Sequence, residues 1–133
     1  PERADEIAML TSSAADADDD TAEPPLDRAG LEWLQAQVAQ IQVAESVAGY
    51  IVDLGRACRR RLGSAHGPSP RALLAWQSAS RAWAFLEGRE HVLPDDVQLM
   101  ASPVLGVRLG LSAEQLRETL DGVLADVAVP VMT

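Results

Sequence analysis

Apolar side chains recur every three or four residues along most of the chain, which is the pattern of amphipathic helices. Residues 31–42 carry one such stripe, formed by Leu31, Leu34, Val38 and Ile41. A second stretch, residues 44–62, ends before Gly63, and glycine commonly terminates helices. The predicted inner face of this stretch consists of Val47, Tyr50, Ile51, Leu54 and Cys58. The pattern therefore predicts two consecutive helices.

The clearest helix start in the sequence is the run Ser69-Pro70-Arg71. Ser69 is a favourable N-cap residue, and Pro70 suits the first helical position because its missing N–H is not needed there. The helix is expected to stop at Gly88, since glycine favours helix ends. Its predicted apolar stripe consists of Ala72, Trp76, Ala79, Trp83 and Leu86. The spacing predicts that both tryptophans of the stripe face the core.

Prolines divide the chain after residue 90. Leu93 precedes a proline, so residues 91–93 are expected to be extended. Pro94 opens a short helix with acids in its first turn, which suits the positive end of a helix dipole. Pro103 is expected to end this helix and to restart the chain after Ser102.

The last predicted helix begins at Ser112, with Gln115 three residues later as a capping box. Pro130 is expected to end it. Its apolar face consists of Leu116, Leu120, Val123, Leu124 and Val127. With no convincing strand elsewhere, the whole pattern predicts an all-α fold, a small helical bundle.

The N-terminal part of the chain has a different composition. Residues 2–10 are predicted to form a short helix, whereas residues 12–25 are dense in Asp and almost lack bulky apolar side chains. Such a segment cannot bury enough surface to offset its ordering entropy, so we predict a flexible acidic loop. Asp16, Asp18 and Asp20 superficially resemble a calcium loop, but the glycine and the closing Glu at their required offsets are missing. The predicted divisions are residues 1–11, 12–25 and 26–133.

Charge limits the classes of partner. The 133 residues carry a net charge of −9, and all eleven basic residues are arginines. A strongly acidic domain is a poor nucleic-acid binder, because phosphates repel it. No apolar run approaches the ~20 residues that a membrane span needs. One cysteine excludes an internal disulfide and fits a reducing compartment, and no signal peptide is recognisable, so a cytoplasmic location is expected.

The side chains that could carry chemistry do not form a catalytic set. The chain has no lysine and hence no GxxxxGK[ST] phosphate loop, and neither HExxH nor CxxC occurs. Cys58 is interpreted as a small core residue and His66 as a loop residue. The run Arg59-Arg60-Arg61 ends a predicted helix, where cations complement the helix dipole. A phosphate or partner contact is the alternative interpretation of this run.

One region resembles a known family. The segment Gly67-Pro68-Ser69-Pro70-Arg71-Ala72, followed by residues 80–98 (SRAWAFLEGREHVLPDDVQ), is similar to the lid of MoxR-type AAA+ ATPases. In that family an SPRA helix start leads to an Ala/Leu-rich helix, a Gly-Arg-acid turn and a Pro-acid-Asp-Val helix. Residues 104–109 resemble a further family stretch, with Val107 where His is usual. The resemblance covers roughly residues 1–11 and 26–128, with residues 1–11 as the segment leaving a nucleotide-binding core.

The resemblance implies a function for the longer protein. A MoxR-type parent is expected to be a ring-forming, chaperone-like ATPase that binds ATP and Mg²⁺ in its core subdomain. Expected partners are that core, neighbouring subunits of the ring and a von Willebrand A-domain protein. Arg71 is implied to be the sensor-2 arginine, which reaches the γ-phosphate, on a helix that Ser69 caps. The phosphate loop and its associated motifs are missing here, so no catalytic residue, cofactor or activity is expected for this chain alone.

Two other classes remain open at this point. The Pro-Asp-Asp-Val helix is also similar to parts of histone-like dimer folds. A stand-alone helical interaction module would then dimerise through residues 94–128. The other is a small enzyme whose site leaves no recognisable motif.

Overall fold

The computed structural model describes residues 3–5, 7–8, 26–63 and 65–131. The chain divides into two units, residues 1–31 and 32–133, which are described separately. The described helices are α2 (Arg28–Gln40), α3 (Glu45–Leu62), α4 (Pro70–Leu86), α5 (Pro94–Leu109) and α6 (Ala113–Asp126). Residues 3–5 and 7–8 are also helical. The all-α prediction is confirmed, whereas the predicted acidic loop, residues 12–25, lies outside the described residues.

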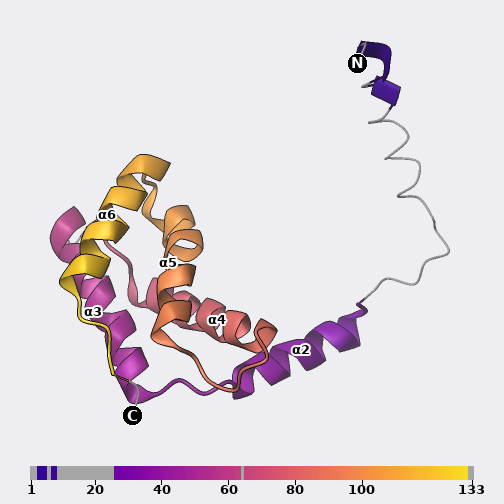
Figure 1. The fold of residues 1–133 in the computed structure, drawn as a ribbon, viewed down its shortest axis with the longest axis horizontal. Helices are drawn as coiled ribbons and strands as arrows, with labels where there is room; N and C mark the ends of the chain where they lie inside the picture. The colour runs from indigo at the N-terminus through magenta and orange to yellow at the C-terminus, as the bar shows by residue number, and fades with distance from the viewer. Residues whose placement is uncertain (1–2, 6, 9–25, 64, 132–133) are drawn as a thin grey trace. The chain divides into compact units, whose positions relative to one another are not determined.

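Helices α3 to α6 form the bundle of residues 32–133 (Figure 1). Helix α4 packs most extensively on α5, and α6 lies against both α3 and α5. The predicted inner face of α3 is confirmed, because Val47, Tyr50, Ile51, Leu54 and Cys58 are all buried. Residues from the other helices complete the same core, and its most deeply buried members include Trp76, Val92, Val97, Leu105 and Val123.

Trp76 occupies the centre of the contact between α4 and α5. Its side chain is fully buried, and its indole Nε1–H donates to the carbonyl oxygen of Val97 at 2.7 Å. Ser80, one turn further along α4, is also buried and donates its hydroxyl to the carbonyl of Trp76 at 3.0 Å. The polar atoms of this region therefore have partners, as buried donors require.

The apolar stripe predicted for α4 is only partly right. Ala72 and Trp76 are buried, but Trp83 is half-buried and Leu86 is 73% exposed. Ala84, which the predicted stripe omitted, is fully buried instead. Residues 72, 76, 80 and 84 follow one another at intervals of four, so the buried face drifts away from Leu86 along this helix.

The predicted break at Pro103 is wrong, because α5 continues from Pro94 through Pro103 to Leu109. The missing N–H of the proline would have bonded the carbonyl of Leu99, and both residues are exposed, so water can hydrate that carbonyl. The helix continues because Val104 and Leu105, immediately after the proline, are buried in the core. Packing therefore outweighs the local cost of proline.

Pro103→Ala is expected to stabilise the domain by about 1–2 kcal/mol. Proline in a helix interior costs roughly 3 kcal/mol relative to alanine, and its restriction of the unfolded chain returns about 1 kcal/mol. Urea unfolding followed by circular dichroism measures the difference. Ser102→Ala, at the neighbouring exposed position, is the control and should change stability by a few tenths of a kcal/mol. A less stable Pro103→Ala variant would contradict this account of α5.

The bounds of two helices also differ slightly from the prediction. Helix α2 begins at Arg28 and ends at Gln40, and α6 ends at Asp126, before Pro130. Asp27 accepts a hydrogen bond from the Gly30 N–H at 2.7 Å, which explains the earlier start of α2. Among the described residues, no helix has the length and apolarity needed to cross a membrane.

Candidate functional site

The predicted site residues, Ser69 and Arg71, lie at the start of α4. The Ser69 side chain accepts a hydrogen bond from the Ala72 N–H at 3.3 Å, and Pro70 occupies the first helical position. Arg71 follows in the first turn and is exposed. It makes no ion pair or hydrogen bond with any residue that the structure describes. The N-cap prediction for Ser69 is confirmed, and the charge of Arg71 is left available to a group outside the described chain.

The loop before Ser69 is fastened to α3 by Arg59. The Arg59 guanidinium donates to the carbonyl of Pro68 at 2.6 Å, and Pro68 is buried. Gly67 lies directly on Arg59, because a Cβ at position 67 would come within 2.8 Å of the Arg59 Cα. Arg59 therefore fixes the segment that delivers Ser69 and Arg71 to the start of α4.

Arg61, two residues further along α3, fastens α6. Its guanidinium pairs with Asp126 at 2.7 Å and lies over Gly122, where a Cβ would overlap it. Both residues of the pair are largely exposed, so the pair itself contributes little stability. The two contacts show that Arg59 and Arg61 have structural partners. The sequence-based interpretation of this run considered only the helix dipole and did not predict these partners.

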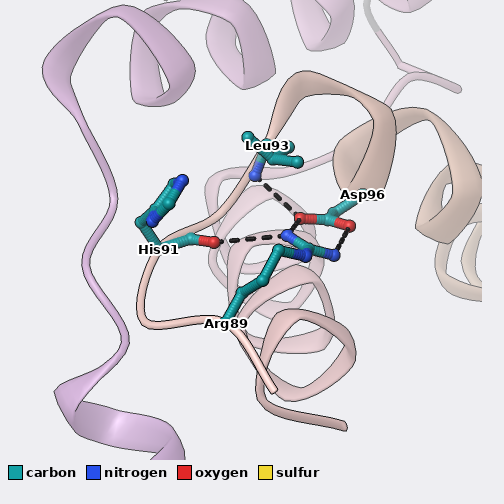
Figure 2. Close-up of polar contacts among 4 residues, drawn as sticks. All are labelled: Arg89, His91, Leu93 and Asp96. Carbon is teal, nitrogen blue, oxygen red and sulfur yellow. Dashed lines mark hydrogen bonds and ion pairs between the residues drawn. The ribbon is translucent and has the colours of Figure 1, made fainter. Parts of the chain in front are cut away.

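A second polar cluster lies between α4 and α5 (Figure 2). Arg89 and Asp96 form a two-point ion pair, with Nη1–Oδ2 and Nη2–Oδ1 distances of 2.6 Å each. Asp96 also accepts the backbone N–H of Leu93 at 2.7 Å, and Arg89 donates to the carbonyl of His91 at 3.3 Å. The Asp96 side chain is 4% exposed and that of Arg89 is 25% exposed. We call these two residues the Arg89–Asp96 clamp.

The clamp shifts the pKa values of both its members. Burial pushes the pKa of Asp96 upward, but hydrogen bonds from Arg89 and the Leu93 N–H, together with the charges of Arg89 and His91, outweigh it. The pKa of Asp96 therefore lies below its usual value. The hydrogen bond to Asp96 raises the pKa of Arg89 further above its ordinary range, against the opposing effect of burial. Both groups are charged at neutral pH, so the pair is ionic.

The extended segment that contains His91 lies against the link between α2 and α3. The Gln42 N–H donates to the carbonyl of Glu90 at 2.9 Å, and the Val92 N–H donates to the carbonyl of Gln42 at 2.9 Å. These bonds make a single parallel bridge between Gln42 and His91, and Val92 is fully buried. The extended prediction for residues 91–93 is confirmed. The Gly-Arg-acid turn and the Pro-Asp-Asp-Val start thus make structural contacts within the lid.

The remaining candidates for chemistry are inert in this setting. Cys58 is fully buried, and burial raises the pKa of its thiol despite the nearby charges of Arg59 and Arg61. A thiol with a raised pKa is a poor nucleophile at neutral pH, which confirms the interpretation of Cys58 as a core residue. His66 is an exposed loop residue, as predicted. The described residues contain no group of His, Cys, Asp and Glu arranged to hold a metal ion.

Comparisons with known proteins agree with this fold. The AAA lid domain family model matches residues 56–127. The uncharacterized protein YeaC of Bacillus subtilis is 29% identical over 96% of this chain and 42% of its own length. MoxR of Paracoccus denitrificans is 47% identical over 47% of this chain and 19% of its own length. A candidate ATPase from Cytophaga hutchinsonii matches in structure with a TM-score of 0.61 and 25% identity, over 72% of this chain and 34% of that one.

More than half of the chain matches the family model, so the chain belongs to the AAA lid domain family. Its similarity to MoxR and to the solved candidate ATPase makes it a lid of the MoxR-type AAA+ ATPases. The chain spans less than half the length of the curated relatives that it matches. The resemblance read from the sequence is confirmed at the level of the lid.

The fold also weighs against the histone-like alternative. A dimer formed through residues 94–128 would need their apolar side chains at the surface. Val97, Leu105, Leu120 and Val123 are instead buried in the core of the same chain. Most of the large apolar side chains that such a dimer would need are therefore used within the lid, and among the described residues 94–128 only Leu99 and Val107 are exposed large apolar side chains.

Proposed function

We propose that this lid senses the nucleotide of its parent ATPase through Arg71. The observation that carries the proposal is an exposed arginine in the first turn of α4 without a partner among the described residues. In the parent, ATP and Mg²⁺ are bound by a core subdomain, and the lid also contacts neighbouring subunits of a ring. The parent acts in the cytoplasm as a chaperone-like ATPase, together with a von Willebrand A-domain protein.

Local electrostatics support a role for Arg71 outside its own helix. The N-terminus of a helix carries a partial positive charge, so an arginine in the first turn is unfavourable there by a few tenths of a kcal/mol. No described carboxylate pairs with it to offset that cost. A phosphate oxygen would, and the planar guanidinium fork suits two-point pairing with phosphate at any physiological pH.

The surrounding contacts support a fixed position for this charge. Ser69 caps the helix, and Arg59 ties the preceding loop to α3 through Pro68. The backbone of Arg71 therefore belongs to a held helix start rather than to a free loop. A sensor needs this property, because it must meet a phosphate at a defined distance as the lid moves.

The test uses the full-length ATPase that contains this lid. Arg71→Ala should lower ATP turnover tenfold or more, which corresponds to about 1.4 kcal/mol at the transition state. The fold should be unaffected, because the Arg71 side chain is exposed. Steady-state hydrolysis and the thermal midpoint of the same preparation measure the two quantities.

Arg117→Ala is the matched control, since Arg117 is exposed on α6 and has no ion pair among the described residues. Its turnover should stay within twofold of the wild type. Equal turnover in Arg71→Ala and wild type would remove Arg71 from the mechanism.

A further inference from the structure

The segment in front of α4 is joined to the body of α3 by one side chain. The Arg59 guanidinium donates to the carbonyl oxygen of Pro68 at 2.6 Å, in a partly buried setting. Within the part of the chain that the structure describes, no other hydrogen bond connects residues 65–69 to α3. Low local polarity strengthens such a bond, because water competes for it only weakly. The place of this segment therefore depends on Arg59.

The bond acts close to the proposed sensor. Pro68 lies three residues before Arg71, so their Cα atoms are no more than ~11 Å apart. Ser69 lies between them and caps α4 by accepting the Ala72 N–H. Pro70 occupies the first helical position, where its ring fixes φ. Few free backbone dihedrals remain between the held carbonyl and Arg71, so a displacement of Pro68 also displaces Arg71.

The body of α4 is held by different contacts. Trp76 and Ala84 are fully buried, and α4 packs most extensively on α5. The Trp76 indole donates to the Val97 carbonyl at 2.7 Å. None of these contacts involves Arg59. Loss of the Arg59 bond should therefore leave α4 folded and packed, while its first turn and the preceding segment become free to move.

We infer that Arg59 is a positioning residue for nucleotide sensing: its bond to Pro68 sets the place of the Arg71 guanidinium relative to the phosphate. Arg59 acts through Arg71 and does not touch the nucleotide. The inference rests on the proposed function, because Arg71 must be the group that meets the phosphate. Neither of the roles that the sequence left open for residues 59–61, dipole complement or direct phosphate contact, includes this one.

Arg59→Met, made in the full-length ATPase, is the first variant. Methionine keeps an unbranched apolar stem beside Gly67 and removes the guanidinium that holds Pro68. Displacement of a reacting group by ~1 Å can slow a reaction by up to about a hundredfold. The loss of Arg71 itself sets the upper limit here, so we expect turnover to fall by about three- to tenfold.

The deciding measurement combines Arg59→Met with Arg71→Ala. A residue that acts only through Arg71 has nothing to position once Arg71 is gone, so the double variant should match Arg71→Ala to within about twofold. A clear further fall would overturn the inference, because Arg59 would then act by another route. Unchanged turnover in Arg59→Met, where Arg71→Ala is impaired, would also overturn it and would retain the sensor. Unchanged turnover in Arg71→Ala would reject both.

Arg61→Met is the matched control. Arg61 lies two residues further along α3, and its guanidinium bonds to Asp126 of α6 rather than to the segment before α4. The variant removes the same charge from the same end of the helix, and its turnover should stay within about twofold of the wild type. Equal losses in Arg59→Met and Arg61→Met would show that turnover responds to charge at this end of α3, and the positioning role would be rejected.

Gly67→Ala disturbs the same contact without changing any charge. The added Cβ would come within 2.8 Å of the Arg59 Cα, so the segment must move away from α3. The backbone of Gly67 is not in the left-handed region, so alanine is tolerated there apart from this overlap. Turnover should fall as in Arg59→Met, and again only while Arg71 is present. A fall of the same size in the Arg71→Ala background would contradict the inference.

Hydrogen exchange of the full-length protein locates the change. In Arg59→Met, the amides of residues 65–72 should exchange faster than in the wild type, whereas those around Trp76 should be unaffected. This pattern is expected because the two regions are held by separate contacts. Faster exchange throughout α4 would show that Arg59 supports the fold of the lid as a whole, and the positioning role would be rejected.

Discussion

Trp76→Ala is expected to lower the free energy of unfolding by about 3–5 kcal/mol, the usual cost of truncating a buried aromatic side chain. Trp76 is fully buried between α4 and α5, and the substitution also removes its hydrogen bond to Val97. The lost contacts lie in the helix pair that packs most extensively in this domain. Urea unfolding followed by circular dichroism measures the loss.

Trp83→Ala is the matched control on the same helix. Trp83 is half-buried and lies outside the buried core, so its truncation should cost about half as much. Comparable losses at both positions would mean that Trp83 contributes to the core as the sequence pattern predicted. An unchanged Trp76→Ala variant would contradict the packing of α4 on α5.

Periodicity predicted most helices well because their buried faces repeat at helical spacing. The five predicted inner residues of α3 are all buried, and Gly63 follows its last residue. Periodicity was less successful on α4, because Leu86 continues the apolar pattern at a point where the helix leaves the core. Burial at the end of a helix depends on its neighbours, and the sequence of one helix does not contain that information.

The predicted helix break at Pro103 was wrong because it, too, was based on local sequence alone. Pro103 has a local cost in a helix interior that the sequence shows plainly. The burial of Val104 and Leu105 that outweighs this cost arises only when α5 packs on the other helices. Local rules therefore predicted a break where tertiary packing retains a continuous helix.

In the candidate site, too, local contacts could be predicted from the sequence, whereas contacts between distant residues could not. Ser69 accepts the N–H of Ala72 only three residues away, with Pro70 between them, so the capped start of α4 could be predicted from spacing alone. Arg59 bonds to Pro68 nine residues away, across a loop whose path no spacing rule gives.

Asp96 shows how a correct local prediction can miss the larger contact. Its place in the first turn of α5 predicted a favourable interaction with the helix N-terminus, and its hydrogen bond from Leu93 is that interaction. The pairing with Arg89 requires the intervening turn to reverse direction. The position of Asp96 in the first turn predicted only the interaction with the helix dipole, and nothing in the spacing identified Arg89 as its partner.

Arg89→Met should destabilise the domain by about 3 kcal/mol at pH 7, the lower end of the range for breaking a buried ion pair. The substitution leaves the buried Asp96 carboxylate without its guanidinium and removes the bond to the His91 carbonyl. Arg108→Met, at an exposed arginine with no ion pair in the described chain, is the control and should cost less than 0.5 kcal/mol. Equal stability of the two variants would show that the clamp does not support the fold.

The pH dependence of the same pair tests its ionic character. The folded pKa of Asp96 lies below the ordinary value of 3.8, so the folded state binds its proton less readily than the unfolded chain. Its contribution to stability is therefore complete above the unfolded value and declines as pH falls through the folded pKa. In Arg89→Met this pKa should rise, because burial then acts without the arginine. The stability gap between wild type and variant should consequently shrink as pH falls from 7 to below about 4. Urea is the denaturant to use, since guanidinium salts screen charge, and a gap that stays constant with pH would reject an ionic clamp.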